Sequence, residues 1–202
     1  MTKPETCYAF DLDGTLTGSE LLPRIAADLG ISEEMAYLTR LTMDGLLDFE
    51  QSFRLRCACL MAAPIERVRA IVASTDVDPR LEAFVSAHRE RCAIVTGNLD
   101  VWIAPLVERF GCPVFSSRAH VVDGRLAGVS SVLNKAHAVM ELKERFATVV
   151  AIGDGVNDVP MFEVADYAVA CGTLHPPAER LIPLADYVVF DGGALCRLLA
   201  TL

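Results

Sequence analysis

Short apolar and β-branched runs recur along the chain, and most of them end in glycine or a small polar residue. Between the later runs lie segments of helical character, such as 81–91 and 100–110. Strands that alternate with helices in this way are typical of a parallel sheet covered on both faces. The segment 120–129 alternates around Asp123-Gly124 and predicts a β-hairpin. The predicted strands are CYAFDLDG, RCAIVTGN, CPVFSS, TVVAIGDG, YAVACG and DYVVFDGG.

Residues 17–79 interrupt the alternation, because they show about four helical segments and no convincing strand. The segments are separated by breaks at 18–19, 30–32, 43–45 and 63–64. The pattern therefore predicts a doubly wound α/β core formed by residues 1–16 and 80–202. A small helical cap, residues 17–79, is inserted after the first strand.

Composition narrows the range of partners. The chain of 202 residues has a net charge of −9, which argues against nucleic acid and against a basic membrane-binding surface. No apolar run approaches the roughly 20 residues that span a bilayer, and the first residues lack the apolar segment of a secretory signal. Seven cysteines without CxxC spacing indicate reduced thiols. We expect a cytoplasmic monomer or homodimer that acts on a small molecule.

Candidate chemistry lies where three predicted strands end. Asp11 and Asp13 end the first strand, residues 96–98 end the second, and residues 153–158 follow the strand that begins at Thr148. Ligands of open α/β sheets bind beyond the carboxyl ends of the strands. These three segments, far apart in sequence, are therefore expected to converge on one edge of the sheet.

The acidic residues at these ends predict a metal and a phosphate. Asp11 and Asp13 can lean the same way, about 6 to 7 Å apart by strand rise. Carboxylates this close, joined by Asp154 and Asp158, need a cation, and an all-oxygen ligand set selects a hard ion such as Mg²⁺. One aspartate can then attack phosphorus while the other transfers a proton. Hydrolysis would pass through an aspartyl phosphate.

The phosphoryl group would also need fixed hydrogen-bond donors, which Thr96, the Gly97 backbone and a lysine can supply. The chain has only three lysines. Lys3 precedes the fold, and Lys143 lies on a helix face suited to solvated ion pairs. Lys135 lies at a predicted helix start, where the dipole does not favour a cation. We therefore expect Lys135 to have a role in the site.

Taken together, these residues resemble the haloacid dehalogenase-like hydrolases, whose core is Rossmann-like. Four motifs match in order: Asp11-Leu12-Asp13-Gly14-Thr15, Thr96, Lys135 and Gly153-Asp154-Gly155-Val156-Asn157-Asp158. The resemblance implies that Asp11 is the nucleophile and Asp13 the general acid and base, while Thr96 and Lys135 bind phosphate. The implied Mg²⁺ site consists of the Asp11 carboxylate, the Asp13 carbonyl and Asp154, with Asp158 in support.

Within that superfamily the insertion is similar to the cap of the phosphoserine phosphatase group. The resemblance includes Glu20, the segment 43–56 and the hairpin segment 123–128. It implies that Glu20 and Arg56 hold the amino and carboxylate groups of the substrate. The expected substrate-binding residues are Glu20, Arg56, Gly97, Asn98 and Asn157.

The periodicity of the cap helix also favours Arg56. The helix has an apolar stripe of Phe49, Phe53, Cys57 and Leu60. Arg56 borders this stripe and should meet an anion, such as a substrate carboxylate. The alternative is a structural ion pair with Asp44 or Asp48. Arg54 follows Glu50 by four residues and needs only a surface pair.

Glu20 and the histidines carry less information. Glu20 is predicted in the first turn of a helix that runs to Leu29, where the helix dipole alone would favour an acid. Its substrate role therefore comes from the resemblance. The histidines show no ligand spacing and are interpreted as surface or loop residues; they are His88, His120, His137 and His175.

Three departures from the phosphoserine phosphatase pattern leave the substrate open. Thr96-Gly97-Asn98-Leu99 stands where that group usually has Ser-Gly-Gly-Phe, so Asn98 could narrow the pocket or bind a different substrate group. Gly14 stands where serine is frequent, and residues 172–177 lack the common Ala-Lys-Pro. The predicted activity is Mg²⁺-dependent phosphomonoester hydrolysis. L-phosphoserine is the first candidate substrate, and another amino-acid, amino-alcohol or sugar phosphate is the second.

Other functions fit the sequence less well. A phosphonate-cleaving enzyme needs a cap lysine, which residues 17–79 lack, and a dehalogenase would not need Asp13. A P-type ATPase needs membrane helices, and a receiver module would be shorter and uncapped. A glycosidase has no use for Thr96 and Lys135. A non-catalytic phospho-acceptor or regulatory protein remains as a remote alternative.

Overall fold

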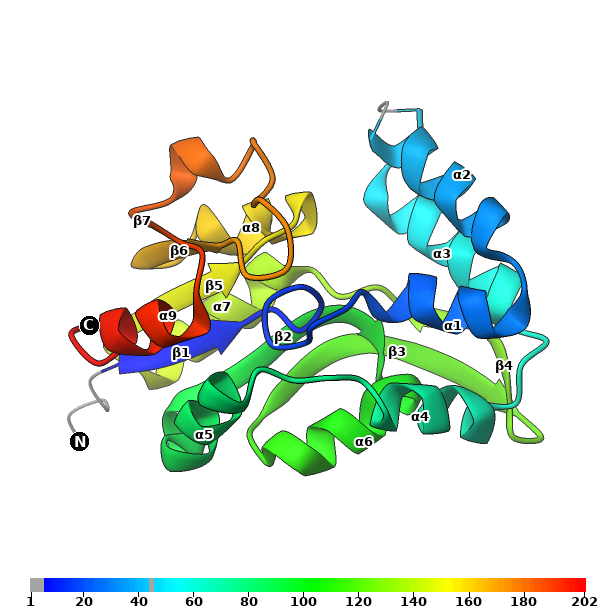
Figure 1. Ribbon diagram of the computed structural model, residues 1–202, viewed down its shortest axis with the longest axis horizontal. Helices are drawn as coiled ribbons and strands as arrows, with labels where there is room; N and C mark the ends of the chain where they lie inside the picture. The colour runs from blue at the N-terminus through cyan, green and yellow to red at the C-terminus, as the bar shows by residue number, and fades with distance from the viewer. Residues whose placement is uncertain (1–5, 44–45) are drawn as a thin grey trace.

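In the computed structural model, which describes residues 6–43 and 46–202, seven strands form one sheet in the order β4-β3-β2-β1-β5-β6-β7 (Figure 1). Neighbouring strands are parallel, except that β3 and β4 are antiparallel. The sheet predicted from the alternation is thus confirmed. The strands are β1 (Thr6–Phe10), β2 (Cys92–Leu99), β3 (Val114–Val122), β4 (Arg125–Ser131), β5 (Thr148–Gly153), β6 (Tyr167–Cys171) and β7 (Tyr187–Val189).

Both faces of the central strands β1, β2 and β5 are buried, as their near-continuous apolar sequences require. Along β1, Tyr8 and Phe10 belong to one apolar cluster, whereas Cys7 and Ala9 belong to a second, because side chains alternate along a strand. Figure 1 shows α5 and α6 on one side of the sheet and α8 on the other. These layers pack against the central strands from both sides. The covering helices are α5 (Pro79–Ala87), α6 (Asp100–Phe110), α7 (Lys135–Arg145), α8 (Val159–Phe162) and α9 (Gly192–Leu199).

The helical insertion, residues 17–79, contains four helices and no strand among its described residues, as predicted. Its two ends meet, since the Gly18 N–H donates to the Asp76 carbonyl at 2.8 Å. In Figure 1, α2 and α3 stand side by side above α1, at one end of the sheet. The four helices are α1 (Leu21–Leu29), α2 (Ser32–Met43), α3 (Phe49–Leu60) and α4 (Ile65–Ala73).

The predicted hairpin is formed by β3 and β4 and reaches the insertion. Asp123 and Gly124 both have positive φ, 49° and 72°, the conformation of a tight two-residue hairpin turn. Arg54 of α3 donates to the Val129 carbonyl of β4 at 2.7 Å, and the Ile65 N–H at the start of α4 donates to the Gly124 carbonyl at 3.3 Å. The hairpin thereby fixes α3 beside the sheet.

Several smaller expectations are also settled. The predicted helix 81–91 is shorter, because His88 leaves helical geometry and a 3₁₀ turn, Arg89–Arg91, follows. Lys143 lies at the surface and pairs with Asp166 at 2.8 Å. All seven cysteines are free thiols, five of them buried. No helix in the described ranges combines the length and apolar character needed to cross a membrane. The predictions for Lys3, Asp44 and Gly45 concern residues outside the described part.

Candidate active site

The central strands bring the candidate residues together. β1 lies between β2 and β5, and the chain reverses its direction across the sheet at this point, where ligands of doubly wound folds bind. The Asp11 N–H continues the β1–β5 pairing by donating to the Ile152 carbonyl at 2.8 Å. Asp11, Thr96 and Asp154 line one cavity of about 210 Å³. The expected convergence of the three strand ends is therefore present.

Lys135 lies between two carboxylates, one of which, that of Asp11, belongs to the cavity lining. Its Nζ donates to Asp11 Oδ1 at 2.6 Å and to Asp158 Oδ1 at 2.5 Å, and the three side chains are at most 4% exposed. Burial alone would lower the pKa of Lys135, but the two carboxylates outweigh it and raise the pKa. Burial and the Asp158 charge raise the pKa of Asp11 to about 7, against the opposing effect of Lys135. One ammonium group thus balances only one of the two carboxylates.

Asp158 uses its second oxygen on the backbone. Oδ2 accepts hydrogen bonds from the N–H groups of Asp154 and Gly155 at 3.0 and 2.9 Å. Both of its oxygens are therefore bound to protein donors. Asp158 fixes the loop that carries Asp154 and, at the same time, the ammonium group of Lys135.

Asp154 faces Asp11 and is held from two other loops. The Thr15 hydroxyl donates to Oδ1 at 3.0 Å, and His175 Nε2 lies 3.2 Å from Oδ2. Burial, followed by the charges of Asp11 and Asp158, raises the pKa of Asp154 to about 9. Gly14 has a φ of +72°, and a Cβ there would lie 2.5 Å from the Asp154 carboxylate. A side chain at position 14 would disrupt this arrangement.

This acidic cluster fits a metal ion. Carboxylate oxygens of Asp11, Asp154 and Asp158 lie within 4.8 Å of one another, and all three residues are buried. Burial and the neighbouring acidic charges raise the pKa of Asp11 and that of Asp154, and a bound cation would favour the ionised form of both carboxyls. An all-oxygen donor set with excess negative charge suits a hard divalent cation. Glu20, Asp154 and His175 form a second close group.

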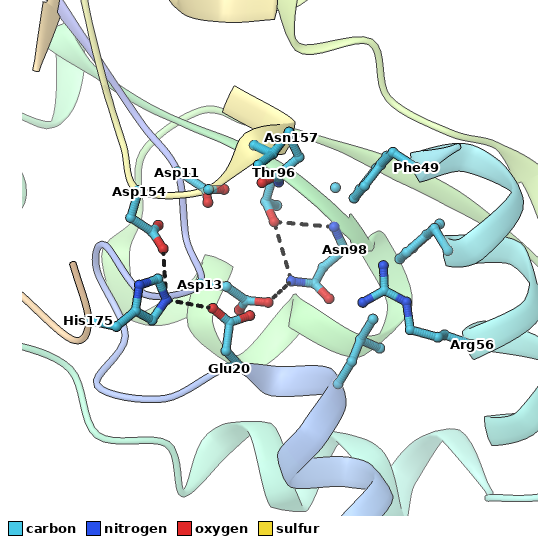
Figure 2. A pocket seen from close by; sticks show the side chains of 15 residues that line it. Asp11, Asp13, Glu20, Phe49, Arg56, Thr96, Asn98, Asp154, Asn157 and His175 are labelled. Carbon is cyan, nitrogen blue, oxygen red and sulfur yellow. Dashed lines mark hydrogen bonds and ion pairs between the residues drawn. The ribbon is translucent and has the colours of Figure 1, made fainter. Parts of the chain in front are cut away.

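Asp13 points away from that cluster, toward the end of β2. Asn98 Nδ2 donates to Asp13 Oδ2 at 2.9 Å, as Figure 2 shows. Asp13 Oδ1 is buried and has no hydrogen-bond partner in the described part of the chain. Burial and the charges of Glu20 and Asp11 raise the pKa of Asp13 well above its usual range. The two N-terminal aspartates thus have different surroundings.

Arg56 lies on the opposite side of the cavity. Its Nε donates only to the Ser52 carbonyl, at 3.4 Å, and no carboxylate from residues 6–43 or 46–202 forms an ion pair with it. Asp48 instead caps α3 by accepting from the Gln51 N–H at 2.7 Å; the other alternative, Asp44, is outside the described residues. Burial lowers the pKa of Arg56. Arg54 pairs with Glu50 at 2.8 Å, as predicted.

Phe49 of α3 closes the cavity beside the phosphate-binding candidates. Its Cζ would lie 3.1 Å from a Cβ at Gly97, and its ring stacks on Phe53 at a centroid distance of 6.0 Å. Gly97 thus allows the aromatic ring to approach the backbone of β2. Asn157 lies on the same cavity, and Figure 2 shows it near Thr96.

One prediction about Glu20 was wrong, and one residue was missed. Glu20 is not in the first turn of α1 but at the N-cap, with extended backbone and no capping hydrogen bond. Its carboxylate instead lies 3.5 Å from His175 Nε2. His175 is a loop residue, as interpreted from the sequence, but it also lines the cavity. It follows Glu20 by 155 residues, so no sequence spacing could indicate their contact.

The fold and the four motifs define a class of enzyme. The chain belongs to the haloacid dehalogenase-like hydrolase family, whose model matches residues 8–163. It is 33% identical over 183 residues to a phosphoserine phosphatase of Methanocaldococcus jannaschii, covering 84% of this chain and 87% of the relative. It is 31% identical over 208 residues to a phosphoserine phosphatase of Halobacterium salinarum, covering 96% and 97%.

Solved structures agree with this assignment. A substrate-bound phosphoserine phosphatase complex superposes with a TM-score of 0.83, 28% identity and coverage of 100% of both chains. A phospho-aspartyl intermediate analogue of phosphoserine phosphatase superposes with a TM-score of 0.80 and 29% identity, covering 94% of this chain and 95% of that one.

Proposed function

We propose that this protein is a Mg²⁺-dependent phosphoserine phosphatase that forms an aspartyl phosphate on Asp11. The observation that carries the proposal is the pairing of two features across one small cavity. Asp11 is held by Lys135 on one side. Arg56, which forms no ion pair with a carboxylate in the described part of the chain, lies on the other. A molecule with a phosphate at one end and a carboxylate at the other fits both. The similarity to several phosphoserine phosphatases supports this substrate.

In the first half of the reaction, an Asp11 carboxylate oxygen attacks phosphorus, and the bond from phosphorus to the ester oxygen breaks. Asp13 gives its proton to that oxygen, which leaves as the alcohol. Lys135 fixes the orientation of Asp11, because its Nζ donates a buried hydrogen bond to Asp11 Oδ1. Thr96 and the Gly97 N–H are proposed as donors to the phosphoryl oxygens.

In the second half, Asp13 is a carboxylate and takes a proton from water as the water oxygen attacks the aspartyl phosphate. The bond from Asp11 to phosphorus breaks, and inorganic phosphate is released. The raised pKa of Asp13, caused by burial and by the charges of Glu20 and Asp11, suits a group that must be protonated in one half and ionised in the other. A single carboxyl can therefore serve both halves.

The metal would be held by the Asp11 carboxylate, the Asp13 carbonyl and Asp154. When bound, Mg²⁺ supplies positive charge to the buried carboxylates and to the phosphoryl oxygens. We assign Asp158 to support of the site, because its oxygens are already bound to Lys135 and to two backbone N–H groups.

We further propose that residues 17–79 act as a cap that selects the substrate. Arg56 would bind the substrate carboxylate and Glu20 its ammonium group, while Gly97, Asn98 and Asn157 would surround the remainder. His175 lies 3.5 Å from Glu20 and would compete with that ammonium group for the Glu20 carboxylate. This contact favours, as a second candidate, the phosphate ester of another small amino acid, amino alcohol or sugar. The free cysteines support a cytoplasmic location.

A panel of phosphate esters tests the substrate. With Mg²⁺ present, phosphate release is measured for phosphoserine, phosphothreonine, histidinol phosphate, phosphoethanolamine and a hexose phosphate. We expect phosphoserine to have the highest kcat/KM. A much faster reaction with histidinol phosphate or the hexose phosphate would contradict the roles of Arg56 and Glu20. No release from any ester would contradict the phosphatase itself.

A further inference from the structure

The pairing of β2 with β3 is interrupted next to the phosphate-binding candidates. Thr96 pairs with Ser116. The next pair along the two strands is Leu99 with Ser117, so two residues of β2 have no register partner on β3. A bulge of this kind leaves backbone groups without their usual partners in the sheet. The Gly97 carbonyl lies in the bulge, and because β2 is buried along its length, this carbonyl needs another hydrogen-bond donor.

The side chain of Ser117 is that donor. It is fully buried, and its hydroxyl donates to the Gly97 carbonyl at 2.6 Å. The same hydroxyl oxygen accepts a hydrogen bond from the Leu133 N–H at 3.0 Å. A hydroxyl has only one proton to donate, so the contact with Leu133 leaves that proton directed at Gly97. The segment that leads into α7 therefore fixes the hydroxyl of Ser117.

The carbonyl that Ser117 holds belongs to the peptide group between Gly97 and Asn98. A peptide group is planar, so a fixed carbonyl also fixes the direction of the N–H at its other end. That N–H, of Asn98, donates to the Thr96 hydroxyl oxygen at 3.2 Å, and Asn98 Nδ2 lies 3.4 Å from the same oxygen (Figure 2). Thr96 thus accepts from protein donors, and its own O–H is left to donate into the cavity that Thr96 lines.

We propose that Ser117 is a positioning residue for phosphoryl transfer, a role that rests on the proposed function. Ser117 fixes the peptide group after Gly97, and this peptide group in turn orients the Thr96 hydroxyl toward the phosphoryl oxygens. Consecutive buried hydrogen bonds of this kind strengthen one another. Ser117 does not itself line the cavity. It therefore acts on the part of the site that every phosphate ester uses, and not on the choice among esters.

The kinetics of Ser117→Ala test this role. Without the hydroxyl, the peptide group after Gly97 can tilt, and a displacement of about 1 Å can cost about 100-fold in rate. We expect kcat/KM to fall about 10- to 100-fold with phosphoserine and equally with p-nitrophenyl phosphate, because the two esters share the phosphoryl group. Ser116→Ala is the matched control on the same strand, with its side chain on the opposite face. Its kcat/KM should change by less than about twofold.

Two further measurements separate positioning from a general loss of stability. Tyr8→Phe also removes a buried hydroxyl that donates to a carbonyl, that of Leu199 at 2.8 Å, but outside the cavity lining. Its Tm should fall, as in Ser117→Ala, while kcat/KM changes by less than about twofold. In a Thr96→Val background, which has no hydroxyl to orient, Ser117→Ala should change kcat/KM by less than about threefold.

The outcomes separate this inference from the proposed function. Ser117→Cys, which nearly keeps the side-chain volume but is a weak donor, repeats the measurements, and the Tm of each variant shows that it is folded. Unchanged kcat/KM in both Ser117 variants, a loss confined to phosphoserine, or the same loss with and without the Thr96 hydroxyl would overturn the positioning role while leaving the phosphatase intact. If the unmodified protein hydrolysed neither ester, the proposed function would be wrong and this role would be wrong with it.

Discussion

The two sides of the cavity are built differently. On the floor, defined as Asp11, Lys135, Asp154 and Asp158, side chains are at most 4% exposed. These residues are joined by contacts of 2.5 to 3.0 Å. On the wall, defined as Glu20, Phe49 and Arg56, the polar groups are partly exposed and make contacts of 3.4 to 3.5 Å. The floor is therefore organised before a ligand arrives, which favours electrostatic catalysis. On the wall, the charges of Glu20 and Arg56 remain available to bind a ligand.

The largest effect should come from the floor. Asp11→Asn removes the proposed nucleophile, so we expect kcat for phosphate release to fall by about 10⁴-fold or more. The amide oxygen introduced at position 11 can still accept a hydrogen bond from Lys135. The substitution also removes a buried negative charge that lies beside the negative charge of Asp158. The Tm in EDTA should therefore be no lower than that of the unmodified protein. Phosphate release at the original rate would show that Asp11 is not the nucleophile. The floor could then not be described as the catalytic side of the cavity.

The wall should affect substrate choice more than chemistry. Arg56→Ala should lower kcat/KM for phosphoserine about 10- to 100-fold. A hydrogen bond to a charged group typically contributes about 1.5 to 3 kcal/mol, which corresponds to about that factor in kcat/KM. Phosphoethanolamine, which has no carboxylate, should lose less than about threefold. Arg54→Ala is the matched control, because Arg54 lies on the same helix but pairs with Glu50.

Equal losses of kcat/KM for the two esters in Arg56→Ala would indicate a structural role for Arg56. A loss specific to phosphoserine in Arg54→Ala would place the carboxylate site elsewhere on α3. Either result would require a different description of the wall.

The same contrast explains what the sequence could predict. Asp11, Thr96 and Asp154 lie at strand ends, and the topology of parallel strands brings such ends together whatever the loops do. Lys135 was found because the chain has few lysines and only one at a suitable helix start. These inferences needed only local patterns and one rule of fold geometry.

Other features of the site depend on how loops pack. His175 lies beside Glu20 and Asp154 because the loop after β6 folds onto the first motif, where Thr173 donates to the Gly14 carbonyl at 3.2 Å. Asn98 could be noticed as a departure from a pattern, but its bond to Asp13 depends on a rotamer. Glu20 was placed one residue too far into α1, since helix ends are set by local backbone angles that a periodicity does not determine.

The smallest expected effect concerns the stability of the floor without metal. The pKa of Asp11 is raised to about 7 and that of Asp154 to about 9, whereas in the unfolded chain both lie near about 4. At a pH between about 4 and these raised pKa values, the folded protein holds more protons than the unfolded one. The free energy of unfolding of the metal-free protein therefore falls as pH rises from about 4 toward 9. Metal binding should offset this loss, because it favours the ionised carboxylates.

Replacing EDTA by Mg²⁺ should therefore raise the Tm more at pH 8 than at pH 6. We expect the two increases to differ by about 3 °C or more, since the Tm of a protein of this size shifts by about 2 to 4 °C per kcal/mol. Asp154→Asn should remove most of that difference, whereas Arg56→Ala should retain it. Thermal unfolding at the two pH values measures all three proteins. If Arg56→Ala reduced the difference as much as Asp154→Asn, the excess charge would not be confined to the floor, and the division between a charged floor and a selective wall would fail.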